Sequence, residues 1–268
     1  MPQSAGGAVR YGAKPLDQLR NREIEATSID VWATSLTVAY ETDPAAIAAV
    51  LPPPLQPSDE PLVRIAIATV DVGHGYPVFG AGTFAVQAVH EGLVGNYPLL
   101  MPMTTEQAVI GGRETFGEPK KLGDVTLQID GDEVTGWFAR MGVRFVEVTG
   151  TKGAELPTPQ PARRTDFYFK FLLDPAGKGF DSDPALVYCH RDEKARSLWA
   201  IDDATVTLRE APLDPVVDLP VRRVVSVELG ERSSVQTGEI RQTVSPDDIL
   251  PYVHQRYDDL SVLGAPDK

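Results

Sequence analysis

The sequence predicts a mainly β domain of the α+β class, in which an antiparallel sheet curls into a cone or barrel around an internal cavity. Many runs are rich in β-branched and aromatic residues, which favour strands. Most of these runs are joined by turn-length connections, which imply antiparallel pairing. The 268 residues are 42% hydrophobic and show no repeat or composition break, so we expect one domain over 29–268. Residues 1–28, which are polar and contain glycine, are predicted to form an N-terminal arm.

In the first half of the domain, turn residues separate the predicted elements. Asp43 and Pro44 are typical of the start of a helix, which we expect to end before Pro52. The run before this helix is rich in β-branched residues, and the run after it is almost continuously apolar and therefore buried on both faces. A glycine-containing turn predicts a hairpin next, and a Thr cap then predicts a second helix. The expected strands are 29–42, 61–72, 83–92 and 96–103, and the expected helices are 43–51 and 104–114.

The second half continues with short strands and ends in a helix. Gly131 and Asp132 predict a tight turn between two strands. Ser245 is a candidate cap for a terminal helix over 245–260, with acidic residues in its first turn. We expect a linker over 157–164. The expected strands are 124–130, 133–140, 143–151, 166–174, 185–192, 204–210 and 221–229.

Composition and missing motifs narrow the range of functions. The net charge is −13, from 38 acidic and 25 basic residues, which argues against nucleic acid or an anionic membrane surface as a partner. The single cysteine excludes an intrachain disulfide and fits a cytoplasmic location. No apolar run is long enough for a membrane span. The four histidines are scattered and no nucleotide-binding loop is present, so we expect neither a metal nor a cofactor.

Two adjacent lysines follow a proline within GGRETFGEPKKLGDV (111–125). Adjacent lysines most often lie in a solvated turn. A functional interpretation requires that one of them is buried, because burial disfavours the ammonium form and leaves free amine near neutral pH. A free amine attacks a ketone or aldehyde and forms a Schiff base, which serves as an electron sink for breaking or making C–C bonds.

The orientation of the second lysine depends on the backbone at the pair. If Lys120 and Lys121 are extended, their side chains point to opposite faces. Lys121 would then hold the loop through a carboxylate or backbone partner. If the pair lies in a turn, both amines could share one side and repel each other, which makes Lys121 a catalytic candidate that would lower the pKa of Lys120. The residue before Pro119 is biased towards extended geometry, but the sequence leaves both alternatives open.

The PKKLG segment and its surroundings resemble the acetoacetate decarboxylases. The similarity runs in order through EPLVR (60–64), GNYPLLMPMTTEQAVIGGRE (95–114), VTGWFARMGVRFVEVTGTKG (134–153) and PLDPVVDLPVRRVVS (212–226), and covers roughly residues 29–260. The resemblance implies a β cone, a homo-oligomer, and a Schiff base at the first lysine, Lys120. Acetoacetate decarboxylase is itself the general example of a lysine activated by desolvation or by a neighbouring cation, so that activation is implied by the resemblance.

Several further residues are candidates for the site. In an extended segment Glu118 shares a face with Lys120, so it is a candidate acid/base; the alternative is an ion pair with Lys121 or Arg113. Arg113, from the family's GRE, is a candidate for binding a substrate carboxylate, with an ion pair to Glu106 or Glu114 as the alternative. Aromatic side chains are candidates for the cavity wall and for substrate contacts: Tyr252, Phe116 and Tyr97.

The sequence departs from the decarboxylases at three polar positions. Alignment places Ala33 where they carry an Arg, Ala66 where they carry a Glu, and Gly80 or Ala81 where they carry a second Glu. Without these groups, imine chemistry stays possible but the selection for acetoacetate is lost.

Three functions therefore remain open. The first is a lyase that forms a Schiff base with a small keto acid. The second is an aldolase-dehydratase that condenses pyruvate with an aldehyde through the same imine. The third is a non-catalytic protein that binds an apolar carbonyl compound. In each case the expected partner is a small keto acid or ketone.

Overall fold

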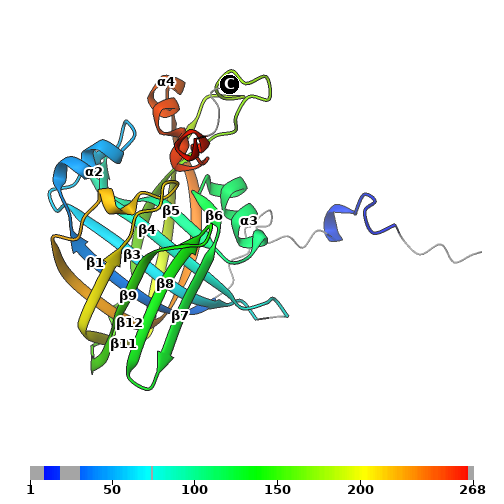
Figure 1. Ribbon diagram of the computed structural model, residues 1–268. Coiled ribbons are helices and arrows are strands. Elements are labelled where there is room, and N and C mark those ends of the chain that lie inside the picture. Colours follow the sequence, from blue (N-terminus) through cyan, green and yellow to red (C-terminus); the bar gives the residue numbers. More distant parts are fainter. Residues whose placement is uncertain (1–8, 19–30, 74, 265–268) are drawn as a thin grey trace, which may run out of the picture.

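A computed structural model describes residues 9–18, 31–73 and 75–264. Within these residues the chain forms a large curved sheet, with α2 (Pro44–Val50), α3 (Glu106–Phe116) and α4 (Pro246–Ile249) towards one end of the strands (Figure 1). Apart from 9–18, the predicted arm over 1–28 lies outside the described residues, so the division into arm and domain stays a prediction.

Strands account for most of the described structure. The helical segments are η1 (Leu16–Gln18), α2 (Pro44–Val50), α3 (Glu106–Phe116), η2 (Val216–Asp218), α4 (Pro246–Ile249), η3 (Leu250–Gln255) and η4 (Leu260–Leu263). The strands are β1 (Trp32–Glu41), β2 (Gln56–Pro57), β3 (Leu62–Asp71), β4 (Phe79–His90), β5 (Leu93–Met103), β6 (Lys120–Leu122), β7 (Asp124–Asp130), β8 (Glu133–Arg140), β9 (Val143–Glu155), β10 (Ala162–Lys170), β11 (Ala185–Leu208) and β12 (Arg223–Thr243).

The sheet closes into a circle. Its order is β10-β5-β4-β3-β1-β12-β11, and a further pairing between β11 and β10 completes the ring of hydrogen bonds. The strands β9, β8 and β7 extend the sheet from the second half of β11. Pairing is antiparallel except where β5 meets β10 and β6. The predicted fold class, a mainly β protein with a closed, largely antiparallel sheet, is confirmed.

Two strands are much longer than the sequence pattern indicated. β11 has 24 residues and β12 has 21, whereas we expected strands at 185–192, 204–210 and 221–229. The missed part of β11 is rich in charged residues and lacks apolar alternation. Cross-strand ion pairs such as Arg196–Glu231, with an N–O distance of 2.8 Å, hold these charged side chains on the sheet.

The expected terminal helix over 245–260 is wrong as a single helix. α4 ends at Ile249, and a six-residue 3₁₀ helix, η3, follows it. Pro251 stands at the start of η3. Because proline has no backbone N–H and its ring clashes with the preceding turn, it prevents α4 from continuing.

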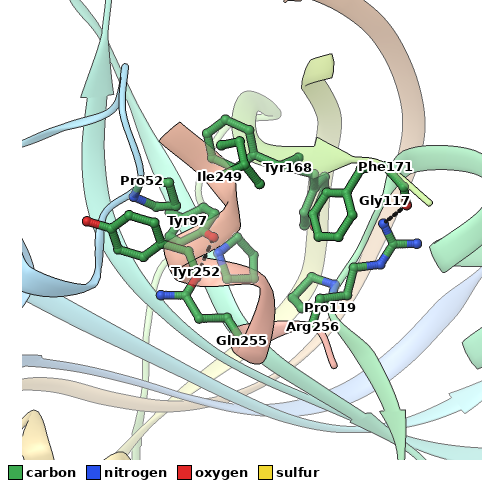
Figure 2. A pocket seen from close by; sticks show the side chains of 12 residues that line it. Pro52, Tyr97, Gly117, Pro119, Tyr168, Phe171, Ile249, Tyr252, Gln255 and Arg256 are labelled. Carbon is green, nitrogen blue, oxygen red and sulfur yellow. Dashed lines mark hydrogen bonds between the residues drawn. The ribbon is translucent and has the colours of Figure 1, made fainter. Parts of the chain in front are cut away.

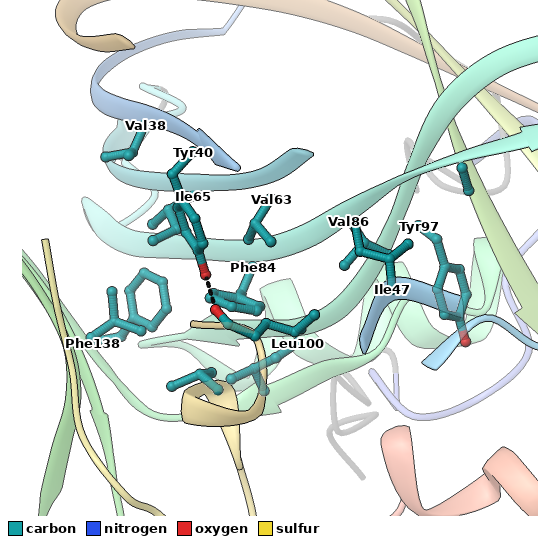
Figure 3. Packing of buried hydrophobic residues seen from close by; sticks show 14 of the residues in the cluster. Val38, Tyr40, Ile47, Val63, Ile65, Phe84, Val86, Tyr97, Leu100 and Phe138 are labelled. Carbon is teal, nitrogen blue, oxygen red and sulfur yellow. Dashed lines mark hydrogen bonds between the residues drawn. The ribbon is translucent and has the colours of Figure 1, made fainter. Parts of the chain in front are cut away.

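The two faces of the circle differ in character. One face carries the apolar core, where Val63, Ile65, Phe84 and Val86 are at most 1% exposed (Figure 3). Tyr40 belongs to this core, and its hydroxyl donates a hydrogen bond to the Leu219 carbonyl at 2.8 Å. We call the opposite face the lysine face: it carries Lys120, Met101, Ala81, Ala66 and Gln236, together with the residues that alternate with them in register.

The lysine face is turned towards the inside of the circle. Arg64 on β3 is electrostatically coupled to Arg164 on β10, Glu193 on β11 and Glu228 on β12. None of these strands is a neighbour of β3 in the circle. β10 and β11 are each three strands away from β3 around the circle, so Arg164 and Glu193 interact with Arg64 across the interior, and groups on this face converge.

Candidate active site

The turn between α3 and β6 positions the lysine pair. α3 ends at Gly117, which adopts a left-handed conformation with φ of 81° and donates its backbone N–H to the Arg113 carbonyl. After Pro119 the chain enters β6, which pairs in parallel with β5 so that Lys120 lies beside Met101. The pair is therefore extended, and the two lysine side chains leave the strand in opposite directions.

Lys120 forms an ion pair with Glu118. Its Nζ lies 2.6 Å from Oε2 of Glu118, whose side chain is fully buried, while the Lys120 side chain is 15% exposed. Oε1 of Glu118 accepts hydrogen bonds from Arg191 at 3.1 Å and from Gln236 at 2.9 Å. Oε2 accepts no hydrogen bond from the other described residues. Of the two roles proposed from the sequence, the ion-pair role is present, but the partners are Lys120 and Arg191 in place of Lys121 and Arg113.

The charged groups around Glu118 keep its carboxylate ionised. Burial alone would raise the pKa of Glu118, but attraction to Lys120 and Arg191 and the hydrogen bonds from Lys120 and Gln236 outweigh burial, so the pKa lies below the ordinary value. The resting site thus holds an ionised carboxylate in contact with Nζ of Lys120.

Arg191 links this pair to a second buried carboxylate. Its Nε donates to Asp166 at 2.7 Å, and Asp166 also pairs with Arg164 at 2.6 Å and accepts from Asn96 at 3.2 Å. The result is a chain of alternating charges, Asp166, Arg191, Glu118 and Lys120. The sequence analysis missed Arg191, Asp166 and Gln236. Arg191 lies at the end of a predicted strand, in the charged run HRDEK (190–194), which is typical of a solvated segment.

Gly112 on α3 lies directly against the ion pair. A Cβ added here would come within 1.9 Å of Oε2 of Glu118 and 2.6 Å of Nζ of Lys120. We expect Gly112→Ala to displace the pair, because overpacking costs about 1–3 kcal/mol and exceeds the gain of about 1 kcal/mol from alanine in a helix. Thermal unfolding should show a lower midpoint than wild type. A midpoint above that of wild type would mean that α3 and the Lys120–Glu118 pair can move apart without a loss of stability.

Lys121 points away from Lys120 into a separate buried network. Its Nζ lies 2.6 Å from Asp258 and 3.4 Å from Asp214, and the Arg140 guanidinium contacts the same two carboxylates. This network ties β6 to β8 and to the chain segments that carry Asp214 and Asp258. The extended alternative is therefore the one that the fold adopts, and it gives Lys121 carboxylate partners.

Lys121→Met should lower stability while leaving chemistry at Lys120 intact. We expect a loss of roughly 2–3 kcal/mol in the free energy of unfolding, because the substitution removes one of two cations from a buried network in which Arg140 still contacts both carboxylates. Denaturant unfolding measures the loss. A change in the pH dependence of adduct formation at Lys120 would instead assign Lys121 an electrostatic role in the site.

An apolar wall lies next to Lys120 on the lysine face. Met101, Met103, Tyr168 and Cys189 form a small buried cluster, against which Phe116 packs. Burial raises the pKa of the Cys189 thiol to about 11, so the thiol is protonated at neutral pH. The predicted position of Phe116 in a wall is consistent with this packing, while contact with a substrate stays a prediction.

Tyr97 and Tyr252 line a small cavity beside this wall (Figure 2). The cavity volume is about 20 Å³, enough for a water molecule. Gly117, Pro119 and Tyr168 also line it, so it adjoins the site across the turn before Lys120. The Tyr97 hydroxyl donates to Oε1 of Gln255 at 2.6 Å. Substrate binding by either tyrosine stays a prediction.

Arg113 is engaged by the backbone. Its Nη1 donates to the carbonyls of Lys120 at 3.0 Å and Arg256 at 3.1 Å, and its guanidinium lies 5.1 Å from the Tyr257 ring centre. Between residues 31 and 264, apart from 74, it forms no ion pair with Glu106 or Glu114. These contacts fasten β6 to the C-terminal segment, and carboxylate binding by Arg113 stays a prediction.

The three positions that lack the family's polar groups lie on the lysine face. Ala66 pairs with Thr37 and with Thr83, and Ala81 pairs with Met103. Ala33 is two pairs along β1 from Ser35. A Cβ at Gly80 would instead meet Val125, on the opposite face, so Ala81 is the residue at the third position. Small side chains thus occupy these positions of the lysine face.

The described residues contain neither a cluster suited to a metal ion nor a membrane-spanning helix. Among them, no three His, Cys, Asp or Glu side chains are grouped so that they could hold a metal ion. No helix in the described part of the chain is both long and apolar enough to cross a membrane.

Comparison with known proteins gives consistent matches. The family model for acetoacetate decarboxylase (ADC) matches residues 14–243. The chain is 31% identical over 194 residues to an acetoacetate decarboxylase of Burkholderia cenocepacia, covering 71% of this chain and 78% of the relative.

Solved structures share the fold. A structure described as acetoacetate decarboxylase superposes with a TM-score of 0.71 at 23% identity, covering 80% of this chain and 90% of that chain. The enduracididine biosynthesis enzyme MppR complexed with pyruvate superposes with a TM-score of 0.68 at 17% identity, covering 81% and 91%.

Proposed function

We propose that the chain, which belongs to the acetoacetate decarboxylase family of lyases, forms a Schiff base between Lys120 and the ketone carbon of a small keto acid. The observation that carries this proposal is the buried pair of Lys120 and Glu118, with Nζ and Oε2 at 2.6 Å on the inward face of the circle. The amine is accessible enough to react and has a proton acceptor in contact.

Glu118 can serve both proton transfers of imine formation. It takes a proton from the Lys120 ammonium, which leaves a neutral amine and a neutral acid without any change in net charge. The amine attacks the ketone carbon to give a carbinolamine, and the Glu118 acid protonates its hydroxyl group, which leaves as water. The product is a protonated imine beside a carboxylate, so the original ion pair is restored. Arg191 and Gln236 hold Glu118 in place through these steps.

The imine supports cleavage of a C–C bond. In a β-keto acid, the bond to the carboxylate breaks, its electron pair moves to the imine nitrogen, and carbon dioxide leaves. Protonation of the resulting enamine carbon and hydrolysis then release a ketone and the free lysine.

A second function, condensation of pyruvate with an aldehyde, is favoured by the alanines at positions 33, 66 and 81. The groups that would select a β-keto acid are missing, and a carboxylate next to the imine can remove a proton from the methyl carbon of bound pyruvate. The enamine then attacks an aldehyde. A relative in fold, MppR, is described in complex with the condensation product of pyruvate and imidazole 4-carboxaldehyde.

Borohydride trapping tests the common step. The protein is incubated with pyruvate or acetoacetate, reduced with borohydride and analysed by intact mass and peptide mapping. We expect one adduct, on the peptide that contains Lys120. If no keto acid gives an adduct, the non-catalytic binding function gains support and the Schiff base is excluded. Carbon dioxide release from acetoacetate then distinguishes decarboxylation from condensation, which consumes pyruvate only when an aldehyde is added.

A further inference from the structure

Arg232 is a second cation on the lysine face that the proposed chemistry has not used. It lies on β12, four residues before Gln236, and pairs in register with Ala33 on β1. Alternate residues of a strand share a face, so Arg232 and Gln236 both point into the circle. The sequence analysis aligned Ala33 with an Arg of the decarboxylases, and Arg232 is the residue paired with Ala33 on the adjacent strand.

The guanidinium of Arg232 is only partly satisfied. Nη2 lies 2.7 Å from Oε2 of Glu228 and 3.5 Å from the Thr37 hydroxyl. Nε is buried and has no hydrogen-bond partner, and Nη1 has none among the residues that the structure describes. A buried donor without a partner is uncommon in folded proteins and indicates a bound water, ion or ligand group.

The strand register connects Arg232 with Lys120 along the inward face. Thr37, which the guanidinium contacts, pairs with Ala66, and Ala66 pairs with Thr83 on β4. The next strand is β5, where Met101 pairs with Lys120. The strands between Arg232 and the Met101–Lys120 pair therefore carry the small side chains of Thr37, Ala66 and Thr83 on the inward face.

We propose that Arg232 binds the carboxylate of the keto acid whose ketone carbon reacts with Lys120. This inference rests on the proposed Schiff-base function and adds a group that determines which carbonyl compounds bind. The free N–H groups offer a planar, charged donor set that matches a carboxylate. Glu228 holds the guanidinium in position through Nη2 and competes with the ligand for its charge. The substrate class is therefore keto acids in preference to neutral ketones.

The test compares a charged and a neutral carbonyl compound. Adduct yield after borohydride reduction is measured against the concentration of pyruvate, of 4-oxopentanoate and of acetone. Arg232→Met should raise the half-saturating concentration of at least one keto acid by about 10–100-fold, the scale for loss of charged hydrogen bonds, and leave acetone within about twofold. Arg232→Lys, which keeps the charge without the fork, should lie between wild type and Arg232→Met.

Two further variants distinguish direct binding of the carboxylate by Arg232 from a nonspecific effect of positive charge in the interior. Arg64 faces the same interior and forms no hydrogen bond or ion pair with the described residues. Arg64→Met should therefore leave the half-saturating concentrations of the keto acids and of acetone unchanged. Glu228→Gln should strengthen keto acid binding, because it removes the competing carboxylate. If Arg232→Met unfolds, Arg232→Lys and Glu228→Gln still decide the question.

The outcomes distinguish this inference from the function on which it rests. Equal effects on acetone and the keto acids, an effect of Arg64→Met as large as that of Arg232→Met, or no effect of any Arg232 variant would overturn the role of Arg232. Absence of an adduct with every carbonyl compound in wild type would overturn the Schiff base itself.

Discussion

Lys120→Ala should form no adduct that borohydride can trap, and turnover of any keto acid substrate should fall by at least about a thousandfold. Removal of a covalent nucleophile abolishes the intermediate, and the remaining groups supply only binding and charge. The fold should survive, because Glu118 keeps its contacts with Arg191 and Gln236 when the lysine is removed. Mass spectrometry after reduction measures the adduct, and circular dichroism checks the fold.

Lys121→Met is the matched control for Lys120→Ala. Both variants remove one cation from the same three-residue strand, but only Lys120 lies against Glu118. Retention of the adduct in Lys121→Met and its loss in Lys120→Ala would assign the chemistry to the first lysine. Substantial turnover by Lys120→Ala would contradict both the decarboxylase and the aldolase proposals.

Local patterns predicted much of the frame around these lysines. Strands such as β1 and β3 were predictable because their apolar residues and turn boundaries are local signals. The motif PKKLG gave the position of the lysines, but Pro119 biases only the residue before it, so the sequence left the extended and turn alternatives open. For the extended alternative the sequence predicted a carboxylate or backbone partner for Lys121, but it could not name Asp214 and Asp258.

The partners of Glu118 could not be predicted because they come from distant parts of the chain. Arg191 is 73 residues away and Gln236 is 118 residues away. Both lie on strands whose polar residues resemble a solvated surface when read alone. Only closure of the sheet, which brings β11 and β12 opposite β6, turns these polar residues into an interior network. The choice between Gly80 and Ala81 likewise depended on strand register, which a single sequence does not determine.

Glu118→Gln should destabilise the protein strongly and impair imine formation. The substitution conserves volume but leaves Lys120 and Arg191 as buried cations facing an uncharged amide. Removing one partner of a buried charge network costs roughly 3–5 kcal/mol, which corresponds to a fall in the unfolding midpoint on the order of 10 °C for a domain of this size. Differential scanning calorimetry measures the change. Glu231→Gln, at an exposed ion pair with Arg196, is the control and should cost less than about 1 kcal/mol.

The pH dependence of this loss identifies the carboxylate as its source. The pKa of Glu118 is lowered in the folded protein from the ordinary glutamate value of 4.5. A group with a depressed pKa contributes stability that is fully present above its unfolded value and is lost as the pH falls towards its folded value. The stability gap between wild type and Glu118→Gln should therefore be constant near neutral pH and shrink below about pH 4.5. If the stability gap is equally large at pH 7 and in acid, the loss comes from packing. Glu118 would then not carry the charge that pairs with Lys120.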